Sequence, residues 1–148
     1  MNIKPMMGVE NILLGTSKEA IIKLLGNPDL SRSEEWPDNT ISETWTYSTM
    51  GLQLNFDSDD NYCLSTITLT SKDVVLEGIR PIGLDINRLI EQLPSIILEQ
   101  DFEANAKDYI YPEKEISFWV VDDIVENLTI FPAYDKITDA PIWPLVNS

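Results

Sequence analysis

A helical pattern of apolar residues occurs twice in this chain, each time directly after a glycine. The two copies are residues 15–25 and 83–93, with apolar side chains recurring every three or four positions. That spacing places them on one face of an α-helix. Ser17 and Asp85 stand two places after the glycines, and their side-chain oxygens can accept hydrogen bonds from the free N–H groups of a first helical turn. We therefore expect two amphipathic helices, each with one face buried.

Alternating apolar and polar positions follow each helix, which is the pattern of strands buried on one face. After the first helix the alternating segments are residues 42–49, 51–57 and 62–70. After the second helix they are residues 109–111, 116–121 and 125–131. The order of elements is the same in both copies, and the connections are shorter in the second.

A repeated order of elements is a strong constraint on the fold. We expect an α+β fold in which two helix-plus-antiparallel-meander repeats form one continuous antiparallel sheet with helices on one face. The chain, residues 1–148, is then a single domain of two repeats, about 9–72 and 76–132, with a Pro-rich C-terminal tail at 133–148. The expected core takes the apolar side of each element: Leu24, Leu25, Trp45, Leu52, Leu54, Phe56, Ile67, Leu69, Leu89, Ile90, Leu93, Phe118, Val120, Leu128 and Ile130.

Three stretches carry a weaker pattern. Residues 1–10 are expected to form a short irregular lead, with a strand within it as the alternative, and residues 29–40 a polar loop that holds Trp36. Residues 96–105 fit either a strand or a helical extension.

The composition is that of a globular chain without a membrane segment. Of its 148 residues 43% are hydrophobic, and no apolar run reaches the roughly 20 residues that a membrane helix needs. The first ten residues lack a signal-peptide apolar core. The single cysteine, Cys63, cannot form an internal disulfide, which fits a reducing compartment. We therefore expect a cytoplasmic protein with no membrane partner.

The charge of the chain narrows its possible partners. It has 25 acidic and 10 basic residues, no histidine and a net charge of −15. Nucleic acid is not an expected partner, because its phosphate backbone requires lysine and arginine. An acidic surface can steer a basic protein toward it, and simple solubility is the alternative explanation. Residues 73–148 carry a net −10 and residues 1–72 a net −5.

No residue pattern indicates an enzyme. The absence of histidine removes the commonest general base and metal ligand, and no such base can activate Cys63. The acidic stretch at residues 57–61 is similar to the start of a calcium loop, but Tyr62 and Thr68 stand where an EF-hand needs glycine and glutamate. We interpret this stretch, and Asp122–Asp123 in the second copy, as hairpin turns. We expect no catalytic residue, no metal and no cofactor.

Several motifs of the first copy resemble one repeat of the β-lactamase-inhibitor-protein fold. They are Gly-Thr-Ser at 15–17, Leu-Leu-Gly-Asn-Pro at 24–28, Trp-Thr-Tyr at 45–47 and Gly-Leu-Gln-Leu-Asn-Phe-Asp at 51–57. They also resemble the BamE-type lipoproteins of outer-membrane assembly, which use a single copy. The resemblance covers roughly residues 9–70 and, more weakly, residues 76–131. In the tandem family it implies a curved sheet whose concave face binds a partner protein.

The chain departs from both families, because it lacks the disulfides of the secreted inhibitor and the lipobox cysteine of the lipoproteins. As a small, acidic protein it also resembles the immunity proteins of interbacterial toxin systems, such as contact-dependent growth inhibition. That resemblance implies a protein that binds a cognate, basic, nuclease-type toxin domain and neutralises it. A non-inhibitory BamE-like binding or assembly module is the alternative.

Strand alternation predicts the face that contacts the partner. Side chains in a strand point alternately to opposite faces, so the residues between the buried ones lie on the open face of the sheet. An alternative is that the tail folds back over Trp119 and Phe131, with Trp143 covering them. The predicted contact residues, with the acidic turn of the second copy, are Gln53, Asn55, Thr66, Thr68, Ser117, Trp119, Val121, Asp122, Asp123, Asn127, Thr129 and Phe131.

Reversal of charge in the two acidic turns tests which half of the chain meets a basic partner. We expect Asp122→Lys with Asp123→Lys to weaken binding more than Asp59→Lys with Asp60→Lys, because the second half is the more acidic. Association rates of the two double variants, measured at low salt, give the comparison. Equal losses would refute the asymmetry.

Overall fold

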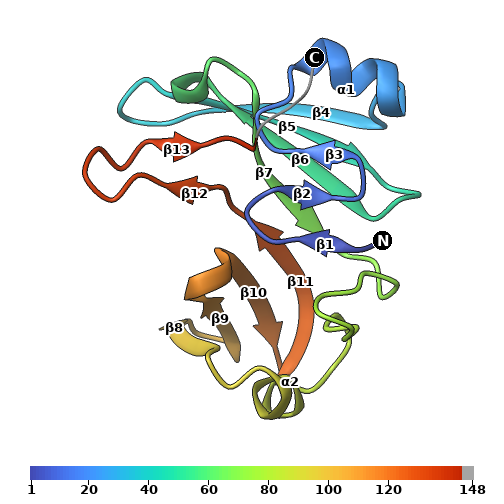
Figure 1. Cartoon of the computed structure of the whole chain (residues 1–148), viewed down its shortest axis with the longest axis vertical. Coiled ribbons are helices and arrows are strands. Elements are labelled where there is room, and N and C mark those ends of the chain that lie inside the picture. Colours follow the sequence, from blue (N-terminus) through green and yellow to red (C-terminus); the bar gives the residue numbers. More distant parts are fainter. Residues whose placement is uncertain (145–148) are drawn as a thin grey trace.

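One antiparallel sheet of eight strands, in the order β4-β5-β6-β7-β11-β10-β9-β8, is the main element of the protein (Figure 1). The computed structural model describes residues 1–144. Two runs of four consecutive strands, β4–β7 and β8–β11, meet where β7 pairs with β11. A three-stranded sheet, β1-β2-β3, and a two-stranded sheet, β12-β13, complete the described structure.

The strands are short, and the helices are shorter than typical. The strands are β1 (Ile3–Lys4), β2 (Gly8–Val9), β3 (Ile12–Leu13), β4 (Leu30–Glu35), β5 (Ile41–Tyr47), β6 (Leu52–Asp57), β7 (Leu64–Leu69), β8 (Ile97–Asp101), β9 (Ala106–Tyr111), β10 (Ile116–Val121), β11 (Ile124–Ile130), β12 (Ala133–Tyr134) and β13 (Pro141–Ile142). The helices are α1 (Lys18–Leu25) and α2 (Ile86–Gln92), and single 3-10 turns are formed by Ser58–Asp60 and Pro112–Lys114.

The predicted fold class, α+β with two helix-plus-meander repeats and helices on one face, is wrong. The protein is mostly antiparallel β, with 44% of residues in strands and 15% in helical turns. The helices have eight and seven residues, and Figure 1 shows them at opposite ends of the molecule with β1–β3 between them. Helix α1 buries only Ile21, and α2 buries only Ile86 and Leu89. Helices this short cannot cover the apolar face of an eight-stranded sheet.

The N-terminal residues cover much of the apolar face of the sheet that the helices leave uncovered. Ile3, Val9, Ile12 and Leu14 are buried in the same apolar cluster as the strands. The strand that sequence analysis left open within residues 1–10 is present as β1 and β2. Strands of two residues are too short to produce a readable alternation, so the sequence did not locate them.

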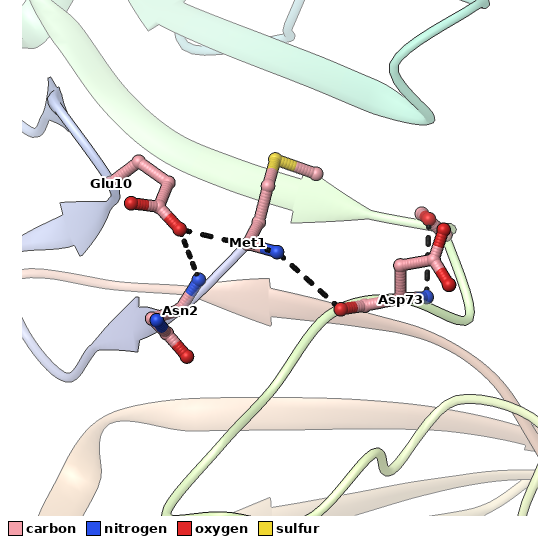
Figure 2. Close-up of polar contacts among 5 residues, drawn as sticks. Met1, Asn2, Glu10 and Asp73 are labelled. Atoms are coloured by element: carbon pink, nitrogen blue, oxygen red, sulfur yellow. Dashed lines mark hydrogen bonds and ion pairs between the residues drawn. The ribbon is translucent and has the colours of Figure 1, made fainter.

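The first residues are fixed to the segment that connects the two runs of strands. The N–H of Ile3 donates to the carbonyl of Val75 at 2.9 Å, and the N–H of Val75 donates to the carbonyl of Met1 at 2.8 Å. Figure 2 shows Glu10 beside Met1 and Asn2, and its Oε1 accepts from the N–H of Asn2 at 2.7 Å. These bonds connect β1 to the centre of the chain and hold both in place.

The helix caps agree with the sequence. Helix α1 has the expected bounds, and the Ser17 hydroxyl accepts from the N–H of Ala20 at 3.2 Å. The Asp85 carboxylate accepts from the N–H of Asn87 at 2.8 Å. Leu24 is 42% exposed, however, so its assignment to the core is wrong.

Sequence analysis missed one outer strand of the sheet and did not decide between strand and helix for the other. Strand β4 lies within the predicted polar loop at residues 29–40, and β8 lies within the uncertain stretch at residues 96–105. Every residue of β4 and of β8 is exposed. A strand exposed on both faces has no reason to alternate, and alternation was the signal used to find strands.

The junction of the two runs provides a test of the core. Leu128 is fully buried and pairs with Leu69 across β7 and β11. We expect Leu128→Ala to lower the free energy of unfolding by about 2–5 kcal/mol, because it removes buried methyl groups and leaves a cavity. The matched control is Leu98→Ala in β8, where the side chain is 48% exposed. Urea unfolding that showed the same small loss for both would contradict the assigned packing.

Candidate functional site

The sheet has one face without a buried side chain, which we call the open face. One row of residues on this face, which we call the central row, has one member from each of the eight strands, and each member is paired with the next across the sheet. The members of this row are half-buried or exposed, and most are small and polar. In spatial order they are Leu30, Thr46, Gln53, Thr68, Thr129, Ser117, Ile110 and Ile97.

The structure places four of the predicted contact residues side by side in this row: Gln53, Thr68, Thr129 and Ser117. At its centre the hydroxyl oxygens of Thr68 and Thr129 are 2.9 Å apart and share a hydrogen bond. None of the twelve predicted residues is buried. The open face is therefore one surface that extends over both runs of strands.

The other predicted residues lie on either side of this row. Asn55 and Thr66 are paired on one side, and the register of β7 with β11 puts Phe131 on that same side. Asn127 and Trp119 are paired on the opposite side. Beyond them lie Val121, Asp122 and Asp123, at the turn between β10 and β11.

The acidic turn between β10 and β11 is attached to the second helix. Asp122 and Asp123 are exposed and have positive φ angles of 50° and 65°. The carbonyl of Asp123 accepts from the N–H of Ile86, the first residue of α2, at 2.8 Å. The two carboxylates therefore lie at the end of the open face, farther from its central row than Trp119.

The largest aromatic group on the open face is a pair formed by Trp119 and Phe102. Their ring centroids are 5.4 Å apart and the rings are tilted by 54°. Phe102 comes from the connection between β8 and β9 and is 40% exposed. Trp119 is half-buried, so the pair presents an apolar surface to solvent next to the carboxylate of Asp108, which pairs with Trp119.

The C-terminal tail does not place Trp143 over this pair. Trp143 packs against Gly15, at the loop before α1, where an added Cβ on Gly15 would lie 2.9 Å from the Cβ of Trp143. The tail instead brings Tyr134 of β12 to the open face near Phe131 and Ser117. Residues 145–148 of the predicted tail lie outside the described residues.

A hollow of about 370 Å³ is formed where Tyr134 meets the second run of strands. Glu99, Asp108 and Glu115 contribute its carboxylates, and Ile110 and Phe131 contribute apolar walls. Burial, followed by the negative charge of Glu99, raises the pKa of the Asp108 carboxyl above its ordinary value. Burial likewise raises the pKa of Glu115. Among residues 1–144 none of these three carboxylates forms an ion pair, so the hollow has a negative potential.

A second hollow, of about 530 Å³, lies at the other end of the open face beside the exposed ring of Trp36. The indole N–H of Trp36 donates to Ser42 Oγ at 3.0 Å, and that hydroxyl donates to Asp57 Oδ1 at 2.6 Å. The amide of Asn55 also donates to Asp57 Oδ1, at 2.9 Å. This network fixes the indole ring beside the sheet and satisfies the carboxylate that it approaches.

The thiol of Cys63 lies outside the open face. Burial, with the charges of Asp60 and Asp57, raises the pKa of the Cys63 thiol, which favours its protonated form. Among residues 1–144, no three potential metal ligands converge. The open face itself offers apolar contacts at Trp119 and Phe102 and charged contacts at the hollow.

Sequence analysis missed several residues of the open face, namely Glu99, Phe102, Asp108, Ile110 and Tyr134. Asp108 and Ile110 had a usable signal, because they alternate with the aromatic residues of β9. Glu99 had none, since a bulge between Leu98 and Gln100 breaks the alternation of β8. The position of Tyr134 depends on the path of the tail, which local sequence does not determine.

The raised pKa of Asp108 predicts a pH-dependent change in stability. Its ionised form is disfavoured in the folded protein, so the wild type loses free energy of unfolding as pH rises through the raised pKa. We expect Asp108→Asn to stabilise the protein at pH 7 and to have little effect well below pH 3.8, where both states are protonated. Asp59→Asn in an exposed turn removes the same charge and is the control for net charge. A gain for Asp108→Asn that persists at low pH would contradict the assignment.

The comparisons with known proteins concern fold alone. No family model matches the chain, and no curated protein matches it. A solved structure that resembles it is a 1.5 Å crystal structure of an extracellular protein containing a SCP domain from Bacillus anthracis str. Ames, with a TM-score of 0.50 and 8% sequence identity. The alignment covers 80% of this chain but only 44% of that chain. Within residues 1–144 no helix has the length and apolar character needed to cross a membrane.

Proposed function

We propose that this protein is an inhibitor that binds a cognate, basic toxin domain through its open face and neutralises it as an immunity protein. The observation that carries the proposal is the open face itself, which is continuous across eight strands and has no buried residue in its central row. The aromatic pair Trp119–Phe102 on this face supports the proposal, because aromatic residues are enriched at protein interfaces.

Negatively charged side chains and an apolar aromatic surface lie close together on the second run of strands. The pair Trp119–Phe102 lies beside Asp108, and the hollow with Glu99 and Glu115 is on the same run. Large aromatic residues dominate binding hot spots, while charges around them steer association. This arrangement favours a partner with a positively charged surface, and a nuclease domain has such a surface because it binds nucleic acid.

Capture followed by neutralisation tests this function. The tagged chain is used to capture proteins from its native host, and each captured protein is then expressed in a bacterial test strain with and without this chain. We expect a basic protein that arrests growth alone and does so no longer when this chain is co-expressed. A captured partner without any toxicity would instead indicate a non-inhibitory binding or assembly module.

Substitution of Trp119 tests the position of the contact. We expect Trp119→Ala to weaken binding of the captured partner by about 2 kcal/mol or more, because central aromatic residues carry much of the binding energy. The loss of its contact with Phe102 should lower the free energy of unfolding by only about 1 kcal/mol. Calorimetric titration and urea unfolding measure the two effects.

Trp36→Ala is the matched control, since Trp36 is an exposed tryptophan at the opposite end of the open face. We expect it to weaken binding less than Trp119→Ala. If Trp119→Ala unfolds easily but binds normally when folded, Trp119 belongs to the core and the contact lies elsewhere.

A further inference from the structure

The hollow beside Tyr134 combines three features that one kind of side chain can satisfy. It is lined by the carboxylates of Glu99, Asp108 and Glu115 and by the apolar side chains of Ile110 and Phe131. Tyr134 adds a second aromatic ring from a different part of the chain. Its volume of about 370 Å³ can hold one long side chain but not a folded element.

The carboxylates of the hollow lack a cation. Ion pairs between residues 1–144 involve Glu10, Glu43 and Glu77, and none involves a carboxylate of the hollow. Asp108 and Glu99 are near enough for the charge of Glu99 to disfavour ionisation of Asp108. A positive group between them would remove this repulsion, so the hollow favours binding of a cation.

The negative potential extends to the tail as well. The pKa of the Tyr134 phenol is raised, first by burial and then by the charges of Glu115, Asp60, Asp139 and Asp57. These carboxylates come from both runs of strands and from the tail. A cation entering the hollow is therefore attracted by more groups than the three that line it.

The lining distinguishes among possible cations. A metal ion is disfavoured, because no three ligand groups converge to hold one within the described part of the chain. An ammonium group suits carboxylates and aromatic faces, but it is a compact point charge that can neither donate through a planar fork nor stack as a plane. A guanidinium group is planar, donates to carboxylates through a fork of N–H groups, and stacks on aromatic rings. Its three-carbon stem can lie along Ile110 and Phe131.

We propose that this hollow receives an arginine side chain of the partner protein, with the guanidinium at Asp108 and Glu99 and the aliphatic stem between Phe131 and Tyr134. The inference rests on the proposed function, because it supplies one specific contact for a basic toxin domain on the open face.

Titration with small probes tests the site without requiring the toxin. The probes are N-acetyl-arginine methylamide, the corresponding lysine compound and the corresponding citrulline compound, which has the shape of arginine without its charge. Amide signals of the full chain are followed by NMR. We expect the arginine probe to shift the signals of residues 108–110, 117, 131 and 134, the lysine probe to bind several-fold more weakly, and the citrulline probe to leave them unchanged.

Asp108→Asn should weaken binding of the arginine probe by about tenfold or more, because a hydrogen bond to a charged group is lost. Asp59→Asn is the matched control, since it removes the same charge from an exposed turn outside the hollow. The NMR spectrum of each variant also reports whether it is folded. Equal losses for both variants, or equal responses to arginine and lysine or to arginine and citrulline, would overturn the assignment.

The two proposals fail in distinguishable ways. Binding of the arginine probe in the hollow, without any captured toxin that this chain neutralises, would support the site and remove the inhibitor function. Neutralisation of a captured toxin, with no response of the hollow to the arginine probe, would support the function and overturn the site.

Discussion

The pairing of β7 with β11 holds the two halves of the sheet together. Three residue pairs form it, Leu69 with Leu128, Thr68 with Thr129 and Ile67 with Ile130. The leucine and isoleucine pairs are buried on one face, and the threonine pair bridges the other face through its hydroxyl groups. A slip of one residue here would exchange the faces of an entire strand, so both the core and the continuity of the open face depend on this register.

Other contacts support this short junction from the side. The connection between β7 and α2 runs past β1 and is hydrogen-bonded to it through Val75. Farther along the same connection, Glu77 accepts a hydrogen bond from the hydroxyl of Tyr111 at 3.1 Å and lies 3.7 Å from the ammonium of Lys114. Burial, with the neighbouring charge of Glu77, raises the pKa of the Tyr111 phenol to about 12, so this hydroxyl remains a donor at neutral pH. Parts of the chain far apart in sequence thus brace the joined strands.

The sequence predicted those strands that have one buried and one open face. Leu52, Leu54 and Phe56 in β6, like Ile116, Phe118 and Val120 in β10, alternate with polar residues because each strand has one buried face, and all six are buried. The strands β4 and β8 lack that asymmetry and gave no pattern. The fold class was misjudged because two clear helical stripes suggested helices that cover a sheet, whereas each helix buries one or two side chains. For the candidate site, alternation identified four of the eight residues of the central row, those of β6, β7, β10 and β11. Tyr134 and Phe102 reach the open face from connections whose paths depend on tertiary contacts.

The exposed strands β4 and β8 leave both edges of the sheet with backbone groups that another strand could pair with. Glu34 and Glu35 on one edge, and Glu99 and Asp101 on the other, place like charges where a second copy would have to approach. The acidity that would attract a basic partner therefore also opposes addition of a ninth strand. A partner that neutralises Glu99 removes part of that repulsion at the same time. A partner that also covers the backbone groups of β8 would leave that edge unable to pair with a further strand.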